Sequence, residues 1–219
     1  MTARGQTEIE APTRAQRTVA RRAAEARATI PDHELGAEVD MDRALRLCER
    51  GSHSLSAAIT RACALSLREH PRANAAYRDG QFELYSRVNV GLLLSSGDDL
   101  VSATVFDADK KSLSELAATI GELRARAASL TRPERSGATF TLTHHDAPGV
   151  AWEVPVVWSG QAAAAAAGEI REVPVLRGRD VAPGRVMTLT LACDHRILHG
   201  ALAARFLARI KELLEHGSL

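Results

Sequence analysis

The order of predicted helices and strands most restricts the fold of this chain. Segments with helical spacing alternate irregularly with strand-like segments, and Asp79-Gly80 is typical of a tight β-hairpin turn. A doubly wound parallel sheet requires a regular alternation of strand and helix. The observed order therefore predicts a mixed α/β layer structure.

Capping residues place the starts of the helices. Thr13 with Gln16 and Ser112 with Glu115 have the spacing of a capping box, and Ser54 precedes an apolar segment. We expect helices over 14–29, 42–50, 55–69, 113–129 and 201–215. We expect strands over 35–41, 81–85, 87–94, 100–106, 138–143, 154–158 and 186–193, with a second turn at Gly97-Asp98-Asp99.

The composition is that of an ordinary globular protein. The 219 residues are 45% hydrophobic and 25% charged, and 28 Lys and Arg balance 27 Asp and Glu. A net charge of +1 and 4% aromatic residues argue against nucleic-acid and membrane binding.

No apolar run approaches the ~20 residues of a membrane span, and the N-terminus lacks a secretory signal. Three cysteines without metal-binding spacing indicate reduced thiols and a cytoplasmic protein.

The sequence predicts a single domain. We find no internal repeat and no long Gly/Ser-rich or Pro-rich linker, so we expect a single domain over 13–219 after a flexible lead-in over 1–12. The sequence contains no G-x-G-x-x-G, G-x-x-x-x-G-K-[ST] or H-E-x-x-H motif. Nucleotide-binding folds and zincin proteases therefore have no support.

The sharpest local feature is the segment TLACDHRILHG, residues 190–200. It predicts a strand that runs into a tight turn carrying Asp194, His195 and Arg196, and then a helix after Gly200. Imidazole titrates near neutral pH, so His195 could act as a general base at a strand end. By spacing alone, a histidine held by hydrogen bonds for structure is the alternative.

This segment and three others resemble one enzyme family. DHRILHG, followed by ALAARFLARIKELLE, resembles the D-H-R-x-x-D-G signature and closing helix of the 2-oxo acid dehydrogenase acyltransferases (dihydrolipoyl transacylases). TIPDHELGAEVDMDRAL resembles the family's first strand, and RVNVGLLLSSGDDLVSATVFDADKKSLSEL its central hairpin and next helix. GATFTLTHHDAPGVAWEVPVVWSGQAAAAAAGEIREVPVL resembles its T-F-T-[IL]-S-N strand and Q-A-A stretch. The resemblance covers about residues 12–216.

The resemblance implies a fold and a mechanism. The family's catalytic domain is a chloramphenicol acetyltransferase-like, mixed-sheet two-layer α/β sandwich that forms homotrimers with active sites between subunits. Its histidine, which matches His195, removes the proton of a thiol that then attacks an acyl thioester. Its oxyanion-binding serine matches Thr143, which keeps the hydroxyl. A positioned hydroxyl donor of this kind is typically worth about 2.7–4 kcal/mol in the transition state.

The same resemblance implies the substrates and partners. The expected donor is an acyl-dihydrolipoyl group on a separate carrier domain that serves a 2-oxo acid dehydrogenase component. The expected acceptor is coenzyme A or the phosphopantetheine of an acyl carrier protein; no individual residue is assigned to bind it. The sequence shows no lipoyl or subunit-binding motif and ends HGSL in place of the family's hydrophobic tail, so two interpretations stay open: an excised catalytic domain, or a stand-alone trimer that receives acyl groups from a separate carrier.

The chain departs from the family pattern at His199, which stands where the family has an orienting aspartate. One interpretation is that His195 still works, since the base and a hydroxyl donor are present; the other is a weakened or lost site. Without the family aspartate at this position, Arg17 or Arg21 would lack the usual counter-ion. Ala103 and Ser159-Gly160 replace family prolines, which changes local backbone stiffness.

Two histidine pairs suggest a metal, but neither has suitable geometry. His195 and His199 are separated by a predicted turn, without an evident third ligand. In His144-His145-Asp146, adjacent strand residues would point to opposite faces. We therefore expect no metal, and expect 144–146 to form part of the channel wall beside Thr143 or a solvent-exposed loop.

Three functions remain open from the sequence. The first is the acyl transfer between thiols just described. The second is a catalytically degenerate trimeric scaffold that organises partner enzymes, which His199 would favour. The third is a small-molecule O- or N-acetyltransferase that uses acetyl-CoA as donor and needs no lipoyl group.

Overall fold

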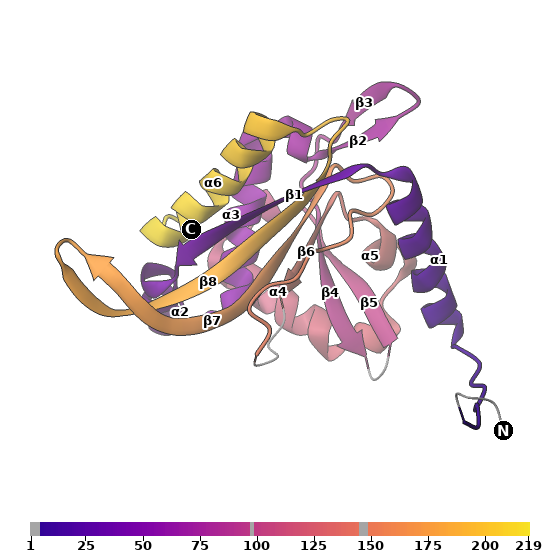
Figure 1. Cartoon of the computed structure of the whole chain (residues 1–219), viewed down its shortest axis with the longest axis horizontal. Helices are drawn as coiled ribbons and strands as arrows, with labels where there is room; N and C mark the ends of the chain where they lie inside the picture. The colour runs from indigo at the N-terminus through magenta and orange to yellow at the C-terminus, as the bar shows by residue number, and fades with distance from the viewer. Residues whose placement is uncertain (1–4, 97–98, 145–148) are drawn as a thin grey trace.

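A computed structural model describes residues 5–96, 99–144 and 149–219 of the chain (Figure 1). One six-stranded sheet with the strand order β1-β8-β7-β6-β4-β5 forms its centre. These strands are β1 (Asp32–Asp40), β4 (Val90–Ser96), β5 (Asp99–Val105), β6 (Phe140–His144), β7 (Ala163–Arg177) and β8 (Asp180–Asp194). The β4–β6 and β6–β7 pairs are parallel and the other pairs are antiparallel, so the predicted mixed sheet is confirmed.

Four helices cover one face of the sheet: α2 (Asp42–Gly51), α3 (Leu55–Glu69), α4 (Leu113–Ala125) and α6 (Gly200–His216). Their apolar residues, such as Leu116 and Phe206, form one cluster with sheet residues that include Leu142, Leu189 and Leu191. Burying such a side chain is typically worth about 1.5–3 kcal/mol, so this cluster is the main source of stability. The predicted two-layer α/β sandwich is confirmed.

The predicted caps form as expected. Thr13 and Gln16 make a reciprocal capping box at the start of α1 (Arg14–Thr29), and Ser112 and Glu115 make one before α4. The Ser54 hydroxyl accepts a hydrogen bond from the Ala57 amide at 3.2 Å and opens α3. These bonds satisfy amides that have no partner inside the helix, which explains why the helix starts could be read from the sequence.

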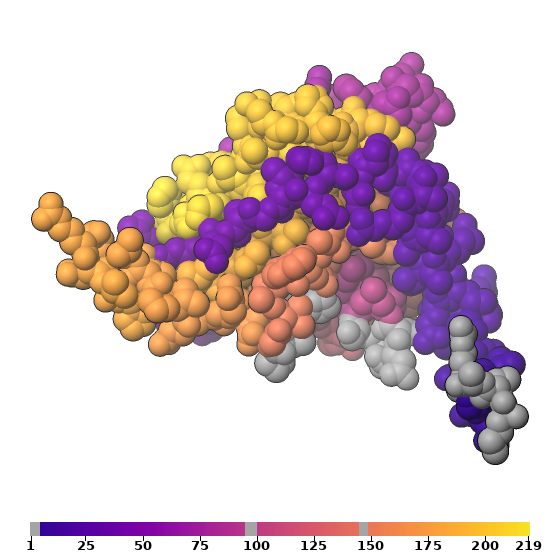
Figure 2. Space-filling model, in the orientation of Figure 1, coloured from indigo at the N-terminus to yellow at the C-terminus, as the bar shows by residue number. Residues whose placement is uncertain are grey.

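Helix α1 buries little of its surface within one chain. Of its 16 residues only Ala26 is buried, and this residue packs with Ile30, Val157 and Ala192 on the face of the sheet opposite the main core. Figure 2 shows α1 and the preceding segment projecting from one end of the molecule, and the β7–β8 hairpin from the other. Leu176 and Val181, on this hairpin, are 74% and 70% exposed.

Two regions differ from the sequence-based expectations. Residues 154–158 form no strand; Pro155 has no amide hydrogen to donate to a ladder, and Val157 is buried against α1 instead. In the alanine run over 162–167, for which no strand was predicted, residues 163–167 begin β7, where neighbouring strands on both sides supply the hydrogen bonds. Gly97 and Asp98, in the second predicted turn, lie outside the described residues.

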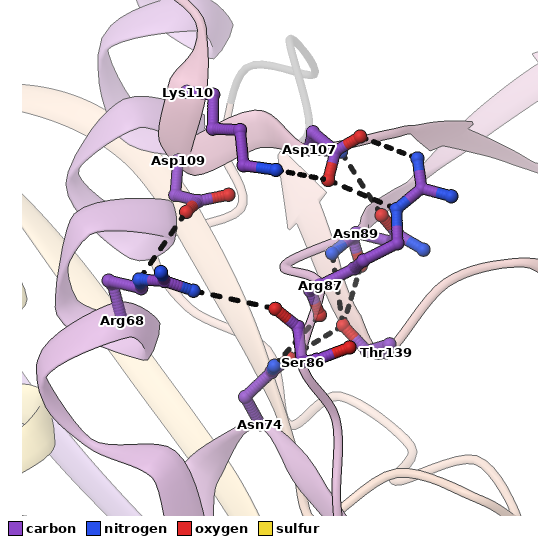
Figure 3. A network of polar contacts seen from close by, with 9 residues as sticks. All are labelled: Arg68, Asn74, Ser86, Arg87, Asn89, Asp107, Asp109, Lys110 and Thr139. Carbon is purple, nitrogen blue, oxygen red and sulfur yellow. Dashed lines mark hydrogen bonds and ion pairs between the residues drawn. The ribbon is translucent and has the colours of Figure 1, made fainter.

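A buried polar network fixes the connections between the strands (Figure 3). The Thr139 hydroxyl donates to Asn74 Oδ1 at 2.6 Å and accepts from the Asn89 amide at 3.1 Å. Asn74 Nδ2 donates to the carbonyls of Tyr85 and Arg87, and Asn89 Oδ1 accepts from the Asp107 amide at 3.1 Å. Four segments that are distant in sequence are thereby joined by satisfied buried groups.

Replacing Thr139 by valine should destabilise this network. The substitution leaves Asn74 Oδ1 and the Asn89 amide buried without their partner, at a cost of about 1–3 kcal/mol in the free energy of unfolding. Urea denaturation of the Thr139→Val variant measures it. Ser136→Ala, which removes an exposed hydroxyl, is the control and should change stability by less than about 0.5 kcal/mol. Equal effects of the two substitutions would contradict the role of the network.

The three cysteines are free, buried thiols, as predicted. Burial raises the pKa of Cys63 to about 12. Burial, together with the carboxylates of Asp194 and Asp32, raises the pKa of Cys193 to about 12. The thiolate is the reactive form of cysteine, so neither thiol is prepared for chemistry at neutral pH.

These raised pKa values predict a loss of stability at alkaline pH. Above about pH 9, the unfolded chain releases thiol protons that the folded chain retains up to about pH 12. The free energy of unfolding should therefore fall across this window, by about 1.4 kcal/mol per pH unit for each thiol. Urea titrations at pH 8, 9 and 10 measure this slope, and Cys63→Ala should reduce it. An unchanged slope in that variant would contradict the assignment.

Candidate active site

The turn after β8 presents His195 at the surface of the chain. The amides of Ile197 and Leu198 donate to the Asp194 carbonyl at 3.0 and 2.9 Å, which closes the turn. The His195 amide donates to the Pro31 carbonyl at 2.9 Å and fixes the turn to the start of β1. The imidazole itself is exposed, so the predicted strand-turn-helix arrangement is confirmed.

An ion pair between the buried carboxylate of Asp194 and the partly exposed Arg196 stiffens this turn. Asp194 is 1% exposed, and its two oxygens accept hydrogen bonds from Arg196 Nε and Nη2 at 2.8 and 2.7 Å. The Arg196 guanidinium also stacks on the ring of Tyr77, 4.5 Å from its centroid. Tyr77 lies on β2 (Ala75–Arg78), which pairs with β3 (Gln81–Leu84). Bidentate ion pairs of this kind hold a backbone segment in one geometry, which suits a catalytic side chain.

The imidazole of His195 lies between two others. The ring of His33 is 5.0 Å away, centroid to centroid, and the ring of His199 is 6.0 Å away. His33 was not identified from the sequence, because its proximity results from the β1–β8 register that pairs His33 with Cys193. The described residues contain no group of three or more His, Cys, Asp or Glu placed to hold a metal ion.

His199 lies at the start of α6, where its extended backbone makes it the N-cap residue, without a capping bond from its side chain. Arg21 pairs with Glu25 of its own helix at 3.7 Å, a different carboxylate from the family aspartate that His199 replaces. Arg17 donates to the Pro12 carbonyl at 2.6 Å. Along the helix, Arg17 is about 18 Å from Thr29, at the end of α1 nearer the turn. The structure therefore brings His199 close to His195, and Arg17 lies far along α1.

Thr143 is buried in β6, far from His195 of the same chain. The sheet register aligns Thr143 with Ala166 of β7 and Thr190 of β8. His195 follows Thr190 by five residues, which is about 17 Å along the strand, and two strand spacings add about 10 Å across the sheet. The two residues are thus about 19 Å apart in one chain by strand geometry.

His144 points to the opposite face of β6 from Thr143. Its Nδ1 lies 2.9 Å from the Ser56 hydroxyl on α3. The side chain therefore contacts the helix layer and not a solvent-exposed loop or the Thr143 face. His145 and Asp146, also expected to border Thr143, lie outside the described residues.

A cavity of about 1010 Å³ lies beneath α1, on the same face of the sheet as Thr143. Thr141, two residues before Thr143, lines it together with Gln161. Five arginines border the cavity, opposed by the carboxylate of Glu25: Arg14, Arg21, Arg22, Arg132 and Arg135. A cavity of this size can hold a small-molecule ligand, and guanidinium groups favour an anionic one.

Comparisons with known proteins agree with this geometry. The family model described as 2-oxoacid dehydrogenases acyltransferase (catalytic domain) matches residues 4–219. A dihydrolipoyllysine-residue acetyltransferase component of the pyruvate dehydrogenase complex from Acholeplasma laidlawii is 30% identical over 98% of this chain and 42% of its own length. This chain thus spans less than half of that relative.

Solved structures show the same fold. The dihydrolipoamide acetyltransferase of Azotobacter vinelandii superimposes with a TM-score of 0.89 at 26% identity, over 98% of this chain and 93% of the other. A chloramphenicol acetyltransferase superimposes with a TM-score of 0.59 at 12% identity, over 89% of this chain and 94% of the other, which concerns the fold alone.

The sheet, its helix layer and the turn after the last strand define a chloramphenicol acetyltransferase-like domain. Within that class, the chain belongs to the family of 2-oxoacid dehydrogenase acyltransferase catalytic domains.

Proposed function

We propose that this chain transfers acyl groups between two thiols, with His195 of one subunit as base and Thr143 of a neighbouring subunit as oxyanion donor. The observation that carries the proposal is an exposed imidazole on a turn held by an ion pair whose carboxylate is buried. In the Azotobacter relative, a serine, a histidine and an asparagine have roles in the catalytic mechanism. Its asparagine follows the histidine by four residues, as His199 follows His195 here.

The proposed reaction needs a base and an oxyanion donor. A thiol with a pKa near ~8.5 is largely protonated at neutral pH, so His195 removes its proton as the sulfur attacks the acyl carbonyl. The new carbon–sulfur bond leaves negative charge on the carbonyl oxygen, where the Thr143 hydroxyl donates a hydrogen bond. As the intermediate collapses, the bond to the donor sulfur breaks, and His195 returns the proton to that thiolate.

In this proposal, assembly into a homotrimer brings His195 of one subunit close to Thr143 of its neighbour. The separation of about 19 Å between His195 and Thr143 in one chain excludes a shared site there without rearrangement of the sheet. Helix α1, with one buried residue, and the β7–β8 hairpin, with exposed Leu176 and Val181, offer surface for contacts between copies. A closed three-fold ring repeats one such contact three times and forms three equivalent sites.

The donor in this proposal is an acyl-dihydrolipoyl group on a carrier domain of a 2-oxo acid dehydrogenase system. The acceptor is coenzyme A or the phosphopantetheine of a carrier protein. The arginine-bordered cavity supports a phosphorylated acceptor, because it lies on the Thr143 face and its guanidinium groups match phosphate geometry. No helix among the described residues is long and apolar enough to cross a membrane. Three buried free thiols suit a reducing compartment such as the cytoplasm.

The arginines that border the cavity should favour an acceptor with phosphate groups, such as coenzyme A, over pantetheine. The double substitution Arg22→Ala and Arg132→Ala removes two cationic groups and should raise the KM for coenzyme A by about three- to tenfold. The KM for pantetheine, which has the same thiol arm without phosphate, should not change. Steady-state kinetics with both acceptors measures this, with Arg50→Ala on α2 as the control. Equal changes for both acceptors would contradict phosphate recognition in the cavity.

Mass spectrometry of carrier proteins tests the proposed function. The purified chain is incubated with acetyl-CoA and dihydrolipoyl domain, or with acetylated dihydrolipoyl domain and holo acyl carrier protein. Acyl transfer that requires His195 supports the proposal. No transfer to any thiol would favour the scaffold, and acetylation of a hydroxyl or amine without a lipoyl group would favour a small-molecule acetyltransferase.

A further inference from the structure

Ser56, His144 and Arg124 form a polar contact between the helix layer and the end of β6. Ser56 lies in the first turn of α3 and is 4% exposed. Its hydroxyl oxygen is 2.9 Å from His144 Nδ1 and 2.9 Å from Arg124 Nη2, at the C-terminal end of α4. Three elements of the fold thus meet at one buried hydroxyl.

The direction of the bond between Arg124 and Ser56 is fixed by chemistry. A guanidinium only donates, so the Ser56 oxygen accepts from Arg124. The Ser56 hydroxyl keeps a second lone pair and its own proton, so it can either accept from His144 Nδ1 or donate to it. One hydroxyl thus bonds to both side chains at once.

The contact lies where β6 loses one of its neighbours. The β4–β6 ladder ends at the pair of Leu92 and Leu142. Among the residues that the structure describes, Thr143 and His144 have ladder partners on the β7 side, Ala166 and Ala167, and none on β4. Because successive strand residues point to opposite faces, His144 contacts the helix layer while Thr143 faces away from it. The side chain of His144 therefore holds the strand at the point where the backbone ladder with β4 no longer does.

From this juxtaposition we propose that His144, held by Ser56 and Arg124, is a positioning residue for Thr143. The inference rests on the proposed function, in which the Thr143 hydroxyl binds the oxyanion. A donor that acts in the transition state must be fixed to a fraction of an ångström, and a misplacement of about 1 Å can cost up to about 100-fold in rate. The network sets the backbone of Thr143 without touching the reacting atoms.

Substitutions of His144 separate positioning from simple stability. The His144→Leu variant should lose about ten- to a hundredfold in kcat with little change in KM, because the lost interaction belongs to the transition state. The His144→Asn variant should retain most of the activity, since its side-chain amide can donate to or accept from Ser56 near the position of Nδ1. Ser56→Ala should reduce kcat in the same direction, and thermal unfolding of each variant checks the fold.

A double substitution provides the decisive comparison. In the Thr143→Ala background, His144→Leu should have no further effect on kcat, because the group that it positions is gone. If Thr143→Ala lowers kcat but His144→Leu and Ser56→Ala do not, the positioning role is wrong and the proposed function stands. A full additive loss in the double variant would also overturn the positioning role. If Thr143→Ala leaves kcat unchanged, the proposed role of Thr143 fails, and the positioning role with it.

Discussion

The His195→Ala variant is expected to lose about 10²- to 10⁴-fold in kcat for transfer between acetyl-CoA and dihydrolipoyl domain, the usual contribution of a general base. The imidazole is exposed on a turn fixed by the Asp194–Arg196 ion pair, so its removal should leave the fold intact. Steady-state kinetics at neutral pH measures the loss, and thermal unfolding checks that the variant is folded.

The loss of turnover rate in the His195→Ala variant should become smaller as the pH rises. As the pH rises toward ~8.5, the pKa of a free thiol, more thiolate forms in solution and the reaction depends less on a base. The ratio of wild-type to variant rates should therefore fall with rising pH. His216→Ala, at the far end of α6, is the matched control and should behave as wild type. A His195→Ala variant with wild-type turnover at every pH would remove His195 from the mechanism.

The second large effect is expected at Thr143. Thr143→Ala removes the proposed oxyanion donor and should lower kcat by about 10²- to 10³-fold, or about 2.7–4 kcal/mol. Thr143→Ser keeps the hydroxyl and should retain activity, whereas Thr143→Val keeps the shape and should fail as alanine does. Single-turnover measurements separate the chemical step from binding.

The three substitutions at Thr143 distinguish chemistry from packing. The threonine is 4% exposed, so a cavity left by alanine could also disturb the strand. If alanine and serine are equally impaired while valine is active, the side chain is needed for its volume and the hydroxyl role is contradicted.

The parts of the fold that could be predicted are those with local causes. The capping residues Thr13, Ser54 and Ser112 fixed helix starts because each cap bonds to its own first turn. The hairpin at Asp79-Gly80 formed because Asp79 and Gly80 adopt the positive φ angles that the tight turn requires. The turn at Asp194 was predicted on the same local grounds.

The parts that were missed have causes distant in sequence. An alanine run has no strong strand preference, and residues 163–167 become part of a strand only because β6 and β8 flank them. His33 reaches His195 through the β1–β8 register, and Ser56 reaches His144 through the packing of α3 on the sheet. Neither contact leaves a signal in a single sequence.

The candidate site was predicted in part. His195 and His199 are brought together as their spacing allows, with ring centroids 6.0 Å apart. The assignment of Thr143 came from the resemblance alone, and its role remains a prediction. The sheet register adds a constraint that the sequence could not provide, namely that Thr143 and His195 of one chain lie at different levels of the sheet.

Mixing the two inactive variants tests the central claim most directly. His195→Ala and Thr143→Ala subunits are unfolded together in equal amounts, refolded and assayed for acyl transfer. If each site takes His195 from one subunit and Thr143 from its neighbour, every mixed trimer contains one intact site, and random assembly should restore about a quarter of wild-type activity. Activity that stays at the level of the separate variants would contradict a site shared between subunits.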